Sequence, residues 1–172
     1  MKEFLEKIDF RRILRYLLFL LLCLLAQEMV LSHIHPFGVR PLILPALAAA
    51  LGMFEGATAG AVYCLVLGYF ADMGFVEHRM FFVLLLPVLS LLSAFVSQFF
   101  INRCFFAFMG VALLELLITA ALQLLKTLAG DVWGSEMLVV AALQTLWSLP
   151  FAALAYILPA RWSREGYVSP HT

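Results

Sequence analysis

The sequence predicts an all-α polytopic membrane protein, built as a six-helix transmembrane bundle with cytoplasmic N- and C-termini. The chain has 172 residues, of which 65% are hydrophobic and 13% are charged, and its mean hydropathy is +1.02. A soluble domain must cover itself with polar side chains, and this composition leaves too few of them. Apolar runs near membrane-spanning length also recur along the chain, separated by short polar connections.

Composition also limits the function classes. A formal net charge of zero and a pI of about 6.9 give no indication of a nucleic-acid partner. Cys23, Cys64 and Cys104 lie in or beside apolar runs without paired spacing, so we expect small buried hydrophobic residues rather than disulfides or metal ligands. The chain has no phosphate-binding glycine loop, nucleophile elbow or HExxH motif. We therefore expect no enzyme activity, no cofactor and no metal.

Residues 1–12 predict a cytoplasmic amphipathic segment that lies on the membrane surface. Its apolar residues share one helical face, namely Met1, Phe4, Leu5 and Ile8. A solvated start to the next helix is the alternative. The first span covers residues 13–31. The best candidate for a signal-peptide cut, before Gln27, has Ala26 but a bulky Leu24 where a small residue is needed, so we expect a retained transmembrane helix. Gln27 and Glu28 fall near its far end, where we expect water or headgroups to solvate them.

The second and third spans are short. Their apolar cores, 41–54 and 57–71, cover only about 21 to 23 Å at 1.5 Å per residue, whereas the hydrocarbon layer is about 30 Å thick. We expect flanking residues to complete both crossings, at 37–54 and 57–76, around a tight inner turn. Arg40 and Asp72 would then lie at the outer interface. A re-entrant hairpin is the alternative, but it would bury Glu55 deep in the membrane.

Small residues recur at every fourth position in this region, at Gly52, Gly56, Gly60, Cys64 and Gly68. Such residues let two membrane helices approach closely. Positions four apart advance about 400° on a helix, so the row drifts by about 40° per step and cannot form one straight seam. We expect Gly52 and Gly56 to belong to the inner turn and the other three to form a packing face, toward this chain or a partner.

The fourth span, near 80–101, contains Pro87, which we expect to kink it, and Ser90, Ser93 and Ser97 on one face. The fifth, near 105–128, carries Glu115, Thr119 and Gln123 at four-residue steps, and the sixth, near 137–159, carries Gln144 and Ser148. These polar residues fall at matching depths. We therefore predict that the last two helices are neighbours joined through them, ahead of a cytoplasmic tail at 161–172. A proton-coupling role for Glu115 is the less favoured reading.

Charge supports an even number of spans and a cytoplasmic N-terminus, and the re-entrant alternative with four true spans passes the same test. The inner segments would hold Lys2, Lys7, Arg11, Arg12, Arg15, Arg103, Arg161 and Arg164, and the outer ones Arg40, Arg79 and Lys126. This distribution obeys the positive-inside rule. Trp133 and Trp162 fit the two interfacial belts. His33 and His35, with Glu77 and His78, suggest a metal site only weakly, and we favour ordinary interfacial histidines.

The chain has Gln27 at the end of the first apolar helix, then the run Val39-Arg40-Pro41-Leu42, and then Gly52, Glu55, Gly56, Gly60, Gly68 and Asp72. On these residues, concentrated between Arg40 and Asp72, it resembles the MreD family of bacterial rod-shape-determining membrane proteins. The chain departs from the family at Leu42, where an acidic residue is common, and at Met73-Gly74-Phe75.

The resemblance implies a non-enzymatic scaffold of the cell-wall elongation machinery in the bacterial plasma membrane. The partners it implies are a bitopic MreC-like protein, a RodA-like polymerase, a class B penicillin-binding protein and actin-like MreB filaments, besides membrane lipid.

A rival reading comes from the substrate-capture subunits of energy-coupling-factor vitamin transporters, which are also small six-helix proteins. An outward pocket would then be lined by His33, His35, Asp72, Glu77, His78 and Trp133. The leucine-rich first helix lacks the Ala-xxx-Ala pattern with which that family docks on its transporter module.

Overall fold

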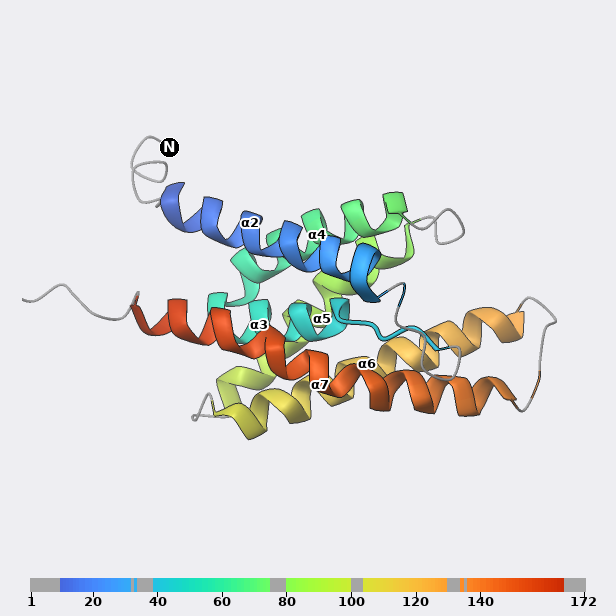
Figure 1. Cartoon of the computed structure of the whole chain (residues 1–172). Helices are drawn as coiled ribbons and strands as arrows, with labels where there is room; N and C mark the ends of the chain where they lie inside the picture. The colour runs from blue at the N-terminus through green and yellow to red at the C-terminus, as the bar shows by residue number, and fades with distance from the viewer. Residues whose placement is uncertain are drawn as a thin grey trace, which may run out of the picture.

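The computed structural model describes residues 10–31, 33, 39–74, 80–99, 104–129, 134 and 136–165. Six helices and no strand occupy this part of the chain, so the all-α prediction is confirmed (Figure 1). They are α2 (Phe10–Leu25), continued by the π-helical turn η1 (Ala26–Leu31), α3 (Leu44–Glu55), α4 (Ala57–Gly74), α5 (Phe81–Phe99), α6 (Phe105–Ala129) and α7 (Glu136–Glu165). Most of the amphipathic segment expected at 1–12 lies outside the described residues.

Three of these helices are long and apolar enough to cross a membrane, over Phe81–Gln98, Phe105–Leu128 and Glu136–Trp162. Large apolar side chains lie exposed along the outer faces of α2, α4, α5, α6 and α7, where lipid is the natural solvent for them. Together these features indicate a multi-pass membrane protein.

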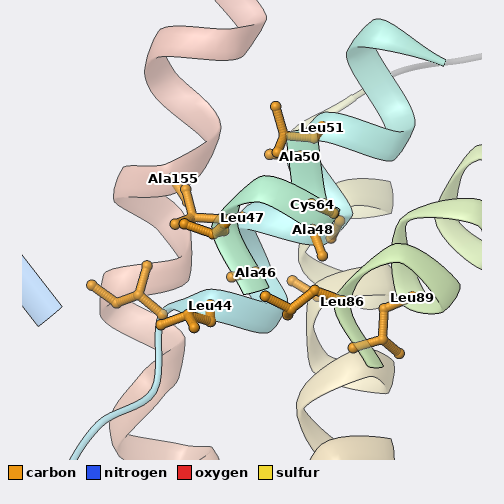
Figure 2. Close-up of a cluster of buried hydrophobic side chains, with 14 of the residues drawn as sticks. Leu44, Ala46, Leu47, Ala48, Ala50, Leu51, Cys64, Leu86, Leu89 and Ala155 are labelled. Atoms are coloured by element: carbon orange, nitrogen blue, oxygen red, sulfur yellow. The ribbon is translucent and has the colours of Figure 1, made fainter. Parts of the chain in front are cut away.

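The short helix α3 occupies the centre of the bundle (Figure 1). Every residue from Leu44 to Phe54 is buried, and α3 packs against α4, α5, α6 and α7. Figure 2 shows Leu47 of α3 beside Ala155 of α7, with Leu86 and Leu89 of α5 on the other side. Alanine and leucine occupy all faces of α3, and the neighbouring helices bury these residues, so protein rather than lipid covers this helix.

The prediction of a helix at 37–54 is therefore wrong in its start and its length. Residues 39–43 are not helical, and the helix that begins at Leu44 is about 18 Å long, too short to cross a bilayer by itself. Pro45 stands in its first turn, where a proline is tolerated because the missing N–H has no helical acceptor. A helix extended toward Phe37 would instead press the Pro45 ring against the carbonyl of Pro41.

The last helix also differs from its predicted bounds. α7 contains Pro150 and Pro159 and continues to Glu165, so the tail expected from residue 161 starts as helix. The Trp162 ring packs edge-on against Tyr16, at 5.0 Å between centroids, and against Phe19 at 5.6 Å. Tyr16 in turn stacks on Tyr63 at 5.5 Å. This aromatic cluster ties the end of α7 to α2 and α4.

Candidate functional site

The segment that leads into α3 is irregular backbone, and polar side chains from two distant helices satisfy it. The Gln27 amide in η1 donates from Nε2 to the Pro41 carbonyl at 2.9 Å, and its Oε1 accepts from the Ile43 N–H at 2.9 Å. The Leu42 N–H donates to Ser148 Oγ of α7 at 2.8 Å. Non-helical backbone is tolerated inside a membrane protein only where protein groups satisfy it in this way. Gln27 and Ser148 therefore hold the entry to α3.

This placement corrects the expectation that water or headgroups solvate Gln27, because its side chain is only 5% exposed. Ser148 Oγ also donates to the Gln144 carbonyl at 2.7 Å, so the hydroxyl both donates and accepts.

The carboxyl group of Glu115 is the most deeply buried acidic group in the described part of the chain. Its side chain is 0% exposed, on α6, and Oε1 contacts the hydroxyl of Ser93 on α5. The same hydroxyl bonds the Leu89 carbonyl at 2.9 Å. A serine hydroxyl has one proton and cannot donate to both acceptors. Both contacts are satisfied when Glu115 carries the proton and donates it to Ser93, which fits a carboxyl group inside a membrane protein.

Three glycines bring α3 and α4 against α5. A Cβ atom on Gly52 would collide with the backbone carbonyl of Ser90, and one on Gly60 would lie 2.6 Å from Ser90 Oγ. A Cβ on Gly68 would lie 2.5 Å from the carbonyl oxygen of Phe82. Close helix approach without side chains is how small residues stabilise membrane bundles. The four-residue spacing thus marks a contact within this chain.

The remaining members of that row have different surroundings. Gly52 lies in α3 and packs on α5, so the expectation that it belongs to the inner turn is wrong. Gly56 lies at the junction of α3 and α4 with φ at +88°, a backbone conformation that residues other than glycine rarely adopt. Cys64 is fully buried in the apolar cluster drawn in Figure 2.

Asp72 joins α4 to the start of α5. Its Oδ1 accepts from the Phe82 N–H at 3.1 Å and its Oδ2 from the Val83 N–H at 2.9 Å. These N–H groups belong to the first turn of α5 and have no acceptor within the helix. Asp72 therefore acts as a cap supplied by the preceding helix. Arg40 lies exposed in the irregular segment before α3.

The polar residues expected to join the last two helices divide into two groups. α6 and α7 do pack side by side, and Thr119, Gln123 and Gln144 line one cavity of about 10 Å³ between them. That volume matches about one water molecule. Glu115 turns instead toward Ser93 of α5, and Ser148 bonds the backbone before α3.

The histidine set is only partly described. The Nδ1 atom of His33 lies 2.8 Å from the Met29 carbonyl. His35, Glu77, His78 and Trp133 fall outside the described residues. Within the described ranges, no three His, Cys, Asp or Glu residues gather in a metal-binding arrangement.

The sequence reading missed Gln27 and Ser90 as parts of this site. An amide near the end of the first apolar span was the available signal for Gln27, since a buried amide needs an internal partner.

Searches against protein-family models, curated proteins and solved structures return no match for this chain.

Proposed function

We propose that this chain is a non-enzymatic scaffold of the bacterial plasma membrane, similar to MreD proteins, that serves the cell-wall elongation machinery. The observation that carries the proposal is where the residues of the resemblance lie. Gly52, Gly60 and Gly68 bring two helices against α5, and Asp72 caps it. Gln27 fixes the entry to α3. Gln27, the three glycines and Asp72 thus belong to the internal contacts that join η1, α3, α4 and α5.

A framework of this kind suits a scaffold, because it holds the outer helix faces at fixed positions. Partner helices in a membrane bind to such faces through packing, since lipid offers no hydrophobic driving force between helices. α2 presents the longest run of exposed leucines, at Leu14, Leu17, Leu18, Leu21, Leu22 and Leu25. In this proposal the single helix of a bitopic MreC-like protein packs on an outer face, and RodA-like, penicillin-binding and MreB-like proteins join the same assembly.

The geometry of Asp72 favours the scaffold over the vitamin-capture reading. Both carboxylate oxygens of Asp72 accept backbone N–H groups of α5. The start of α5 thus accounts for this acid, so its presence no longer argues for a ligand pocket.

Purification of the full-length protein in a mild detergent, followed by mass spectrometry of proteins and small molecules, tests the proposal. We expect a bitopic protein and wall-synthesis proteins to copurify with it. Recovery of a vitamin-sized ligand together with transporter ATPase modules, and without a bitopic partner, would replace the scaffold by the capture subunit.

A further inference from the structure

An open groove lies between α5 and α6 at the end where α5 begins and α6 finishes. The two helices are consecutive in the chain, but α3 packs against both of them and keeps them largely apart. They splay from their connection toward this end (Figure 1). The open groove has a volume of about 460 Å³. It is lined by Met80, Phe81, Leu84, Leu85, Val88, Leu122 and Lys126.

The lining is apolar along its length and cationic at one end. Leu84 and Val88 are exposed there, at 71% and 61%, and Lys126 stands in the last turn of α6. The Lys126 ammonium lies 5.8 Å from the centroid of the Phe81 ring, a cation–π distance that keeps it at the rim. One positive charge thus borders an otherwise hydrocarbon-lined groove.

From the helix ends inward, the groove presents first a charged side chain and then apolar ones, which matches the headgroup and acyl chain of a phospholipid. Phe81 is the first residue of α5 and Lys126 lies in the final turn of α6, so both stand at helix ends, where headgroups lie. Val88 lies seven residues further along α5, about 10 Å deeper. A lipid phosphate can therefore meet the ammonium while an acyl chain follows Leu84 and Val88 inward.

We propose that this groove binds one anionic glycerophospholipid of the surrounding membrane, with its phosphate at Lys126 and an acyl chain between α5 and α6. Charge selects the headgroup and the apolar walls hold the chain. The inference is independent of the scaffold function, since it rests on the groove alone.

Native mass spectrometry of the full-length protein, released from nanodiscs of equal phosphatidylglycerol and phosphatidylcholine, tests this site. We expect retained phosphatidylglycerol to exceed phosphatidylcholine about fivefold, the preference that one lysine near a membrane surface provides. Lys126→Gln should abolish the preference. Arg161→Gln is the matched control, because Arg161 is also exposed but lies on α7 and outside the groove.

A second pair of variants tests the acyl-chain part of the site. Val88→Trp fills the groove and should reduce the retention of both lipids, whereas Leu146→Trp adds the same bulk on the exposed face of α7 and should not. An undiminished preference in Lys126→Gln, or unchanged retention in Val88→Trp, would overturn the proposal. So would a copurifying single-helix protein that crosslinks to Val88→Cys, since the groove would then hold a helix.

Discussion

The hydroxyl of Ser93 indicates which group in the buried core carries a proton. Its hydroxyl lies between the Leu89 carbonyl of its own helix and the carboxyl group of Glu115. Only one of these contacts can use the serine proton, so the other proton comes from the acid. The acid then joins α5 to α6 as a neutral hydrogen-bond donor, without the desolvation penalty of a buried charge.

This assignment predicts how substitutions at Glu115 rank. Glu115→Gln keeps a neutral side chain of the same length with a donor toward Ser93, so we expect a thermal midpoint in detergent close to that of the wild type. Glu115→Lys places an ammonium among fully buried groups and should prevent folding. If Glu115→Gln proved as damaging as Glu115→Lys, the carboxyl group would have to be ionised and paired.

The glycines allow a second test at the residue scale. A side chain at Gly68 meets the backbone of Phe82 and Val83, which cannot move aside as a flexible side chain can. We expect Gly68→Leu to destabilise the protein by more than the roughly 1–3 kcal/mol usual for overpacking. Thermal unfolding followed by fluorescence-detected gel filtration measures the loss.

Two variants serve as controls for Gly68→Leu. Gly110→Leu makes the same change in α6, where an added Cβ meets no atom within 4 Å apart from its chain neighbours and its own helix backbone, so it should be neutral or stabilising. Leu65→Ala trims an exposed side chain of α4 and should change stability by less than about 0.5 kcal/mol. Equal tolerance of Gly68→Leu and Gly110→Leu would show that close contact between α4 and α5 is not required.

At the scale of elements, α3 is the helix that the sequence described least well. Membrane thickness favours a full crossing by each apolar segment, with a re-entrant hairpin as the alternative. α3 needs no full crossing because protein covers all its faces, and a lone sequence does not reveal which helices will surround another. The position of Pro45 was the local signal for a late start.

The hydrogen bonds that support the entry segment could not be predicted from the sequence either. Ser148 lies 106 residues after Leu42, its hydrogen-bond partner, and Gln27 lies 14 and 16 residues before the two groups it bonds. Such pairs follow from packing rather than from periodicity. The helix ranges at 57–76, 80–101 and 105–128 depended only on local apolar runs, and they agree closely with α4, α5 and α6.

Substitutions at the entry to α3 should destabilise the protein more when more backbone groups lose their hydrogen-bond partners. Gln27→Ala releases two buried groups and Ser148→Ala one, and each such group costs about 1–3 kcal/mol when left unsatisfied. We therefore expect Gln27→Ala to lower the thermal midpoint more. Gln27→Glu should fall between Gln27→Ala and wild type, since only the neutral acid can both accept from Ile43 and donate to Pro41, and protonating it at neutral pH costs free energy.

Gln98→Ala is the control for this series, because Gln98 is an exposed glutamine on α5. It should leave the midpoint unchanged. A Gln98→Ala effect as large as that of Gln27→Ala would attribute the loss to glutamine removal in general rather than to the entry segment.

At the scale of the whole molecule, the property to measure is the orientation of the helix bundle in the membrane. The eight inner basic residues predict a cytoplasmic N-terminus. Cys104 offers a native probe, because its side chain is exposed just before α6 whereas Cys64 is buried. In the predicted orientation the connection between α5 and α6 faces the cytoplasm.

Labelling of intact cells should then separate the two sides. Cys104 should react with a membrane-permeant maleimide and resist an impermeant one until the cells are opened. Met80→Cys in a Cys104→Ser background supplies the opposite case, since Met80 is exposed at the other end of α5 and should react with the impermeant reagent from outside. The reverse pattern at both positions would mean that the bundle has the opposite orientation. The Lys126 end of the lipid groove would then lie in the cytoplasmic leaflet, where anionic lipids are most abundant.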